Sequence, residues 1–299
     1  MHARGQKRPF DLAQCPECGF VQRFPSASAG ELARLYGDGY YVYAETDEAR
    51  WARAVQQYAV HLLDFEGSGG RLLDVGCAMG HLAALARARG WRVTGIDLSA
   101  EAVSQAAARF GLDVRAGTLA RHVGTLHRFD VVFMGDVIEH VTHPGQLLGE
   151  AKKVLVPGGC VCIDTPNWGG RWRRWGGPYW LGLNRFHVSL FQADTLARLL
   201  EGLKFADIWT GSYANHRYEA WASRPELDRF LRWLPKFISW RLRRMIARLP
   251  SRSAWADLID PPPTGLEDAR NRIEGLRSDQ LAVSGDSGGD NLVALAVRP

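Results

Sequence analysis

The sequence has few cysteines and no long hydrophobic run. Its five cysteines are an odd number in a chain of 299 residues, whereas small proteins of oxidising compartments use even, paired sets. We therefore expect a reduced, cytoplasmic protein. No stretch approaches the roughly 20 uninterrupted apolar residues of a spanning helix, and the basic N-terminus lacks the apolar core of a secretion signal. No membrane-spanning segment is expected.

Charge of either sign is also limited. Lysine and arginine number 37 against 32 acidic residues, so the formal net charge is only +5. This mild excess favours anionic partners, such as a phosphorylated substrate or a membrane surface, and does not require nucleic acid, which we do not expect as a partner. Hydrophobic residues make up 46% of the chain, enough for the core of one large domain with appendages.

Short apolar runs alternate with helical patterns from Arg71 onwards. This alternation predicts a parallel sheet that is covered by helices on both faces. The expected strands are 71–75, 91–96, 112–115, 129–133, 159–164, 205–210 and 291–297, and the expected helices lie near 81–89, 100–109, 144–155 and 192–202.

Composition divides the chain into a core and appendages. Thr46 is a plausible N-cap for a helix that precedes the first core strand. The predicted units are an N-terminal arm (1–44), a core (45–211), a basic helical insertion (212–288) and a final core strand (289–299).

The insertion contains a basic amphipathic segment at 224–252, which has nine basic and two acidic residues. Apolar residues recur there at helical spacing. Such a helix either lies on an anionic membrane, where it meets a lipid-linked substrate, or packs against the core or a partner subunit. We therefore consider peripheral membrane contact alongside packing.

A nucleoside site is predicted where the first two core strands end. In LLDVGCAMGHLA (72–83), a strand ends at Val75 and a glycine-containing loop leads into a helix. The second strand ends in Asp97, whose carboxylate can accept hydrogen bonds from both ribose hydroxyls of an adenosine.

The loop favours S-adenosylmethionine over a dinucleotide. Gly76, Ala78 and Gly80 depart from the G-x-G-x-x-G spacing that seats a pyrophosphate on a helix N-terminus. Asp74 would repel a pyrophosphate but could organise the cationic ammonium group of S-adenosylmethionine. A nicotinamide-dependent oxidoreductase is therefore a disfavoured alternative.

Four motifs in order resemble the class I S-adenosylmethionine-dependent methyltransferases, over roughly residues 71–211. Within them the chain is similar to the ubiquinone-biosynthesis O-methyltransferase type and to bacterial glycan-modifying methyltransferases. The motifs are LLDVGCAMGHLA (72–83), VTGIDLS (93–99), FDVVFMGDVIEHVTHP (129–144) and VLVPGGCVCIDTPN (154–167). The resemblance implies an α/β, Rossmann-like doubly wound sheet of seven strands whose last strand is antiparallel.

The resemblance also assigns roles around the cofactor S-adenosylmethionine. It implies that Gly76, Cys77 and Gly80 cradle the methionine part, Asp97 the ribose and Leu98 one face of the adenine, with Gly117 and Thr118 at the adenine edge and Met134 and Gly135 near the methyl group. Two positions depart from the family pattern. Ala78 replaces the usual middle glycine, and Thr118 stands where an acidic residue often contacts the adenine amino group.

Methyl transfer from a sulfonium needs a base only if the acceptor must lose a proton. The candidates are Asp136, Glu139, His140, His143 and His187. Histidine has a suitable pKa, and we expect His140 and His187 to be catalytic. Glu139-His140 resembles a family pair that often holds the loop, and His187 stands in a stretch that resembles one bordering the substrate pocket. A structural role remains the alternative for both.

The segment 168–180 contains four tryptophans and three arginines. It is either an acceptor lid that binds sugar or aromatic rings and anionic groups, or a patch that closes over its own core.

Cys15 and Cys18 resemble half of a zinc knuckle. Because no second cysteine pair lies nearby, we expect no bound metal.

We expect O-methylation of a small-molecule or lipid-linked acceptor: a sugar, a glycolipid precursor or a phenolic molecule. The alternative from another class is a non-catalytic S-adenosylmethionine-binding or scaffold protein.

Overall fold

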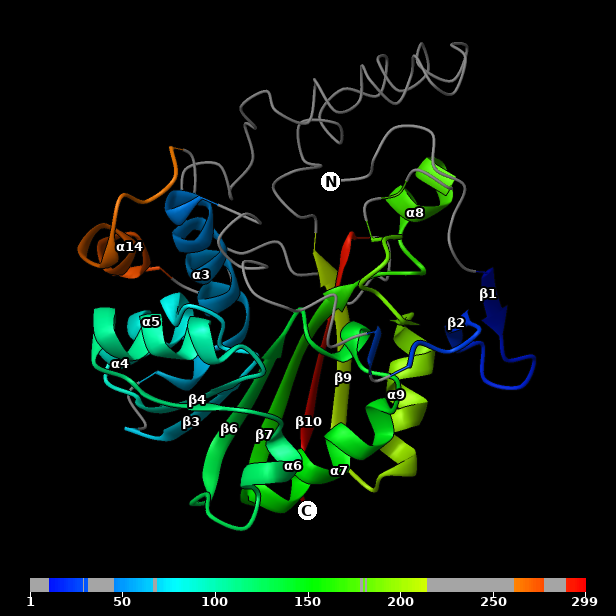
Figure 1. Ribbon diagram of the computed structural model, residues 1–299, viewed down its shortest axis with the longest axis horizontal. Coiled ribbons are helices and arrows are strands. Elements are labelled where there is room, and N and C mark those ends of the chain that lie inside the picture. Colours follow the sequence, from blue (N-terminus) through cyan, green and yellow to red (C-terminus); the bar gives the residue numbers. More distant parts are fainter. Residues whose placement is uncertain are drawn as a thin grey trace.

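The computed structural model describes residues 11–28, 30–31, 46–66, 69–177, 180, 182–213, 261–276 and 289–299, and Figure 1 shows how their elements are arranged. The predicted basic segment 224–252 lies outside these residues, so membrane contact through it stays a prediction.

The core is a seven-stranded mixed sheet. Its order is β5-β4-β3-β6-β7-β10-β9, with β10 antiparallel to both of its neighbours and the other pairings parallel. This confirms the predicted fold class, including the antiparallel last strand. The strands are β3 (Arg71–Val75), β4 (Arg92–Asp97), β5 (Asp113–Ala116), β6 (Phe129–Gly135), β7 (Leu155–Pro166), β9 (Ala206–Tyr213) and β10 (Asn291–Val297).

Helices cover both faces of this sheet (Figure 1). The helices α3 (Asp47–His61), α4 (His81–Ala88), α5 (Ala100–Phe110) and α14 (Leu266–Ile273) contribute to one buried apolar cluster; α6 (Leu119–His122), α7 (Pro144–Val154) and α9 (Ala193–Gly202) contribute to the other. Because side chains alternate along a strand, Leu72 and Phe133 belong to the first cluster and Leu73 and Met134 to the second.

The helix α3 begins where the sequence predicts. The hydroxyl of its N-cap Thr46 accepts a hydrogen bond from the backbone N–H of Ala49 at 3.3 Å. Trp51, Val55 and Tyr58 are almost fully buried, so this face anchors the helix against α4 and α14. The position of α3 matters for the site, because its polar residues reach the ends of the core strands.

The described part of the N-terminal arm is joined to the core. Strands β1 (Asp11–Gln14) and β2 (Val21–Phe24) form a hairpin, and β2 pairs with the short β8 (Ser189–Leu190). Cys15 and Cys18 lie in the hairpin turn and are half-buried. The segment that leads into β8 is therefore held by β2 of the arm and by the core, where the Val188 N–H donates to the Glu139 carbonyl.

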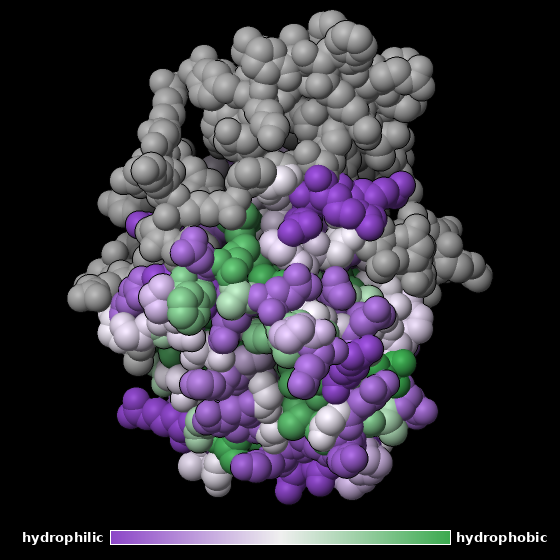
Figure 2. All heavy atoms as spheres, turned by 90° about the vertical axis from the view of Figure 1, so that its right-hand side faces the viewer, coloured by the Kyte–Doolittle hydropathy of each residue, from purple (hydrophilic) through white to green (hydrophobic). Residues whose placement is uncertain are grey.

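On the face that carries β1, β2 and α9, hydrophilic residues predominate and hydrophobic ones form scattered patches (Figure 2). Within the described ranges, no helix has the length and apolar character needed to cross a membrane.

The loop after β3 contains a strained residue. Ala78 has a φ of 47°, in the left-handed region that glycine adopts at little cost and alanine does not. Its backbone N–H donates to Oδ2 of Asp97 at 2.9 Å, and this bond holds the loop in that conformation. The alanine that departs from the family pattern is thus tolerated with backbone strain.

We expect Ala78→Gly to raise the free energy of unfolding by about 0.5–1 kcal/mol, because glycine removes this strain. Chemical denaturation measures the change. The matched control is Ala107→Gly on the exposed side of α5, which we expect to lower the free energy of unfolding by about 1 kcal/mol. An equal loss of stability in both variants would contradict the strain.

Candidate functional site

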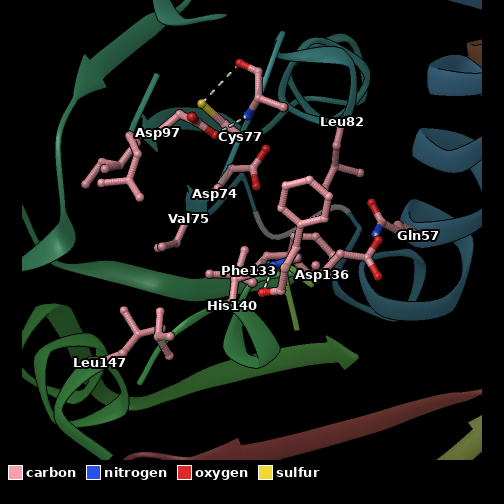
Figure 3. Close-up of a pocket in the computed structure, with 18 of the residues that line it drawn as sticks. Gln57, Asp74, Val75, Cys77, Leu82, Asp97, Phe133, Asp136, His140 and Leu147 are labelled. Atoms are coloured by element: carbon pink, nitrogen blue, oxygen red, sulfur yellow. Dashed lines mark hydrogen bonds between the residues drawn. The ribbon is translucent and has the colours of Figure 1, made fainter. Parts of the chain in front are cut away.

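A cavity of about 1120 Å³ opens at the carboxyl ends of the central strands. The chain runs from β3 outwards to β4 and β5 and then returns to place β6 on the other side of β3, so the cavity lies at the switch point of the sheet. Asp74, Cys77 and Asp97 lie towards one end of it, and Gln57, Asp136 and His140 towards the other (Figure 3).

The loop after β3 lines the cavity at Gly76, where the main chain lies close to Val137. This glycine has a φ of 79°, and a Cβ there would lie 2.3 Å from Cγ2 of Val137. Gly80 is not among the residues that line the cavity, and its role at the methionine part stays a prediction. It precedes α4, and a Cβ there would meet Leu112 and Ala106, so this glycine allows close packing of α4 and α5.

Asp97 presents its carboxylate at the end of β4. Its side chain is 3% exposed, and it accepts hydrogen bonds from the backbone N–H groups of Ala78 at 2.9 Å and Ser99 at 2.8 Å. These bonds fix one carboxylate oxygen each. Because each oxygen has two lone pairs, the group can still accept hydrogen bonds from two ribose hydroxyls.

Asp74 is a buried acid at the same end of the cavity. Its Oδ2 accepts no hydrogen bond from the described residues. Burial, and then the negative charge of Asp97, raise the pKa of Asp74 to about 7. A ligand with a cationic amine would relieve both effects, so the two acids together suit an amino-acid group next to a ribose.

The remaining wall of this end is apolar or neutral. Leu98 lines the cavity and is 61% exposed, which leaves its side chain available to an adenine ring. Gly117 and Thr118 also line it. The Thr118 hydroxyl accepts a hydrogen bond from the backbone N–H of Arg121 at 3.4 Å and thereby caps α6.

Besides Asp74 and Asp97, the predicted cofactor residues Met134 and Cys77 are also buried. Met134 is fully buried in the apolar cluster under α6, α7 and α9 and is not among the residues that line the cavity, so its place near the methyl group stays a prediction. Strand alternation instead turns Phe133 and Gly135 towards the cavity. Cys77 lines the cavity but is 5% exposed, and burial raises the pKa of its thiol, which stays protonated.

The opposite end is built from α3 and from the segment after β6. Asp136 has a φ of 54°, and its Oδ2 accepts hydrogen bonds from Arg53 Nη1 at 2.6 Å and from Gln57 Nε2 at 3.4 Å. Neither Arg53 nor Gln57 was predicted as a site residue from the sequence. Their spacing of four residues on one helix face was the available signal. His143, at the start of α7, also lines this end.

Glu139, His140 and His187 form a cluster at the same wall. Glu139 is 1% exposed, and its Oε2 accepts a hydrogen bond from the hydroxyl of Thr165 at 2.8 Å. Burial raises the pKa of Glu139 well above its usual value. Burial also lowers the pKa of His140 to about 4 and that of His187 to about 3, so both imidazoles are neutral near pH 7.

A buried polar network lies beneath this wall. The carboxylate of Asp164 on β7 accepts hydrogen bonds from Tyr213 at 2.6 Å and Asn291 at 2.7 Å, and His61 Nε2 lies 3.0 Å from it. These partners come from β9, β10 and α3. The network therefore ties together α3, β7, β9 and β10 beneath the cavity, which Tyr213 and Asn291 line.

The predicted lid is partly described. The helix α8 (Arg171–Gly176) lies in it, and the guanidinium of Arg173 stacks 3.7 Å from the ring centroid of Trp168. Trp180 lines the cavity and also packs against Trp168, with ring centroids 6.1 Å apart. The side chains of Trp172 and Trp175 lie outside the described part. Trp180 thus combines packing within the segment with a place on the cavity wall.

Comparison with known proteins identifies the family. A model of a methyltransferase domain matches residues 29–208, more than half of the chain. Ubiquinone biosynthesis O-methyltransferase from Bradyrhizobium sp. (strain ORS 278) is 36% identical over 105 residues, which are 33% of this chain and 41% of that protein. The same enzyme from Caulobacter vibrioides is 41% identical over 112 residues, 34% of this chain and 42% of its own length. The chain thus spans about two fifths of these curated relatives.

Solved structures show the same fold. A SAM-dependent methyltransferase from Archaeoglobus fulgidus superposes with a TM-score of 0.54 at 16% identity, covering 87% of this chain and 100% of that one. Phosphoethanolamine N-methyltransferase 2 from Haemonchus contortus, in complex with S-adenosyl-L-methionine, gives 0.53 at 18% identity, over 93% and 62%. The prediction of a class I S-adenosylmethionine-dependent methyltransferase is confirmed at the level of the family. The chain belongs to the methyltransferase domain family.

Proposed function

We propose that this protein transfers the methyl group of S-adenosylmethionine to a hydroxyl oxygen of a small or lipid-linked acceptor: a sugar, a glycolipid precursor or a phenolic molecule. The observation that carries the proposal is the pairing of two chemically different ends in one cavity. Two buried carboxylates occupy one end, and two neutral imidazoles the other.

The acidic end supports the choice of cofactor. Asp74 suits the ammonium group and Asp97 the ribose, while Leu98 offers an apolar surface for the adenine. A dinucleotide would bring a pyrophosphate close to both carboxylates, and like charges repel strongly in a buried site. This argument disfavours the oxidoreductase alternative.

The opposite end supports a hydroxyl acceptor. When a hydroxyl oxygen attacks the methyl carbon, the carbon–sulfur bond breaks, the oxygen–carbon bond forms and the hydroxyl proton must leave. His140 and His187 line the cavity beside Glu139, and this position supports a role for the cluster in removing the proton. Gln56, which is 3% exposed, lines the cavity with an amide Nε2 that donates to no described residue and suits an acceptor oxygen.

The proposal predicts methyl transfer to a hydroxyl compound. The purified chain would be incubated with methyl-labelled S-adenosylmethionine and panels of nucleotide sugars, glycolipids and catechols, and labelled products would be located by mass spectrometry. A methyl ether together with S-adenosylhomocysteine is the expected result. Methylation of nitrogen alone would contradict the hydroxyl assignment, and cofactor binding without transfer to any panel would favour the non-catalytic alternative.

The raised pKa of Asp74 predicts pH-dependent cofactor binding. The empty site holds a proton on Asp74 below pH 7, and a bound ammonium group favours the ionised acid, so binding releases this proton. We expect the affinity for S-adenosylhomocysteine to rise about tenfold or more between pH about 5.5 and about 7.5. Calorimetry at each pH measures this change.

Asp74→Asn is the control, because an amide does not titrate in this range. The variant should bind more weakly than the wild type at pH about 7.5, and its affinity should change little with pH. Equal pH dependence in the wild type and Asp74→Asn would assign the effect to another group.

A further inference from the structure

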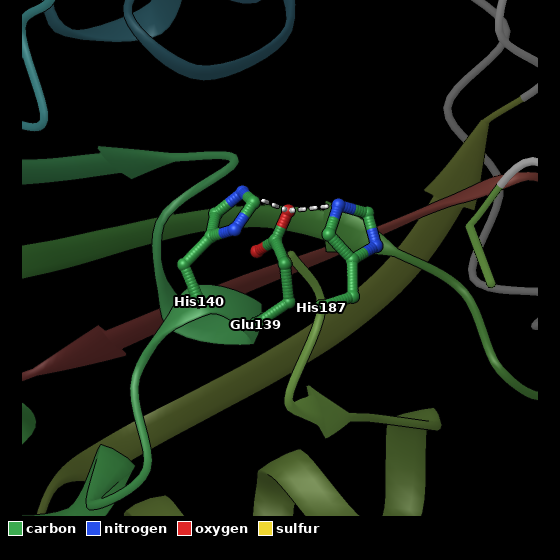
Figure 4. A group of neighbouring side chains, drawn as sticks. All are labelled: Glu139, His140 and His187. Carbon is green, nitrogen blue, oxygen red and sulfur yellow. Dashed lines mark ion pairs between the residues drawn. The ribbon is translucent and has the colours of Figure 1, made fainter. Parts of the chain in front are cut away.

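The side chains of Glu139, His140 and His187 bring three ligand atoms to one place in the cavity wall (Figure 4). Glu139 Oε1 lies 3.7 Å from Nε2 of His140 and 4.0 Å from Nε2 of His187. The three atoms all lie within 4.8 Å of one another. Glu139 and His140 are neighbours in the turn after β6. The fold brings His187, from the segment before β8, beside them.

Backbone carbonyls fix the orientation of both imidazoles. His140 Nδ1 lies 3.1 Å from the carbonyl oxygen of Phe186, and His187 Nδ1 lies 2.8 Å from that of Gly182. A carbonyl oxygen only accepts, so each Nδ1 carries the hydrogen. In the neutral ring, Nε2 then carries the lone pair. This is the arrangement found in metal-binding histidines, whose second ring nitrogen donates to a carbonyl or a carboxylate.

The third atom is a buried acceptor without a donor. Glu139 is 1% exposed, and its Oε1 accepts no hydrogen bond from the described residues, although the Thr165 hydroxyl donates to Oε2. Three electron-pair donors therefore face one another across 3.7–4.8 Å. An unpaired buried carboxylate oxygen is costly, and a cation among the three atoms would remove this cost.

We propose that Glu139, His140 and His187 bind one divalent cation of the first transition row, such as Zn²⁺. Two imidazoles and one carboxylate suit such ions better than Mg²⁺ or Ca²⁺, which prefer oxygen ligands. With metal–ligand bonds of about 2.1 Å, tetrahedral ligand atoms lie about 3.4 Å apart, so small side-chain shifts close the site. This site departs from the expectation, based on the cysteines, that the chain binds no metal.

The position of the site gives the cation a place in the proposed reaction, and this part rests on the proposed function. His140 and His187 line the cavity, so a fourth coordination position would face the acceptor. A cation there lowers the pKa of a bound hydroxyl. The hydroxyl proton then leaves to water, the oxygen takes the methyl group, and S-adenosylhomocysteine departs. The two histidines act as ligands in this scheme.

The test uses Co²⁺ and Zn²⁺ as probes on the full chain, carrying Cys15→Ser and Cys18→Ser so that thiols cannot hold the metal. The variants Glu139→Gln and His187→Asn remove a ligand. Gln keeps the shape of Glu, and the Asn amide can still donate to the Gly182 carbonyl. His143→Asn is the matched control, because His143 lines the same cavity outside the cluster.

We expect about one Co²⁺ per chain, with a visible absorption spectrum of a low-coordinate nitrogen and oxygen site, displaced by Zn²⁺. Glu139→Gln and His187→Asn should weaken Co²⁺ binding by at least about a hundredfold, while His143→Asn binds like the parent. Absence of Co²⁺ and Zn²⁺ binding in the parent, or unchanged binding in both ligand variants, would overturn the site.

S-adenosylhomocysteine binding is measured on every variant by calorimetry and separates the two proposals. The ligand variants should retain it, which shows that they fold and keep the cofactor end. If the parent binds Co²⁺ as expected but forms no methyl ether, the proposed function fails and the metal site stands. If it forms the methyl ether but binds neither metal, the metal site fails alone.

Discussion

The burial of two neighbouring acids, Asp74 and Asp97, is the constraint around which the site is organised. Asp74 lies opposite Gly95 in the pairing of β3 with β4, and Asp97 ends the second of these strands. Both acids are 3% exposed, and the charge of Asp97 is one reason why Asp74 holds its proton up to about pH 7. Both acids line the cavity at the ends of their strands, where the proposed cofactor would bring a positive charge.

The loop between these acids adapts to them. Ala78 adopts a left-handed conformation and donates its backbone N–H to Asp97, and Gly76 brings the main chain close to Val137. Strain in the loop is thus offset by a hydrogen bond to a carboxylate. The same segment leads directly into α4, and the ends of β4 and β5 complete this end of the cavity with Asp97, Leu98, Gly117 and Thr118.

The features that could be predicted from the sequence are those set by neighbouring residues along the chain. The strand and helix alternation, the N-cap Thr46 and the ends of β3 and β4 are local patterns, and the structure has them where they were expected. The sequence did not show which way side chains face at the end of an element: Met134 packs into an apolar cluster, and Gly80 lies against Leu112 and Ala106. The cofactor assignments stay predictions.

The end of the cavity opposite Asp74 and Asp97 could not be predicted from the sequence, because its parts are distant along the chain. Arg53 reaches Asp136 across 83 positions, and Asp164 joins residues from α3, β9 and β10. Glu139 and His187 stand together only because the segment before β8 folds back beside the turn after β6, where the Val188 N–H donates to the Glu139 carbonyl. Tertiary contacts of this kind leave no periodic signal.

The identity of the ligand at the acidic end is the most direct test of this account. Calorimetric titration of the wild type and Asp97→Asn with S-adenosylhomocysteine and with NAD⁺ would decide it. The account predicts that the wild type binds S-adenosylhomocysteine and not NAD⁺, and that Asp97→Asn binds it about tenfold or more weakly, because hydrogen bonds to a charged acceptor are lost. Binding of NAD⁺, or equal affinity of both proteins for S-adenosylhomocysteine, would contradict it.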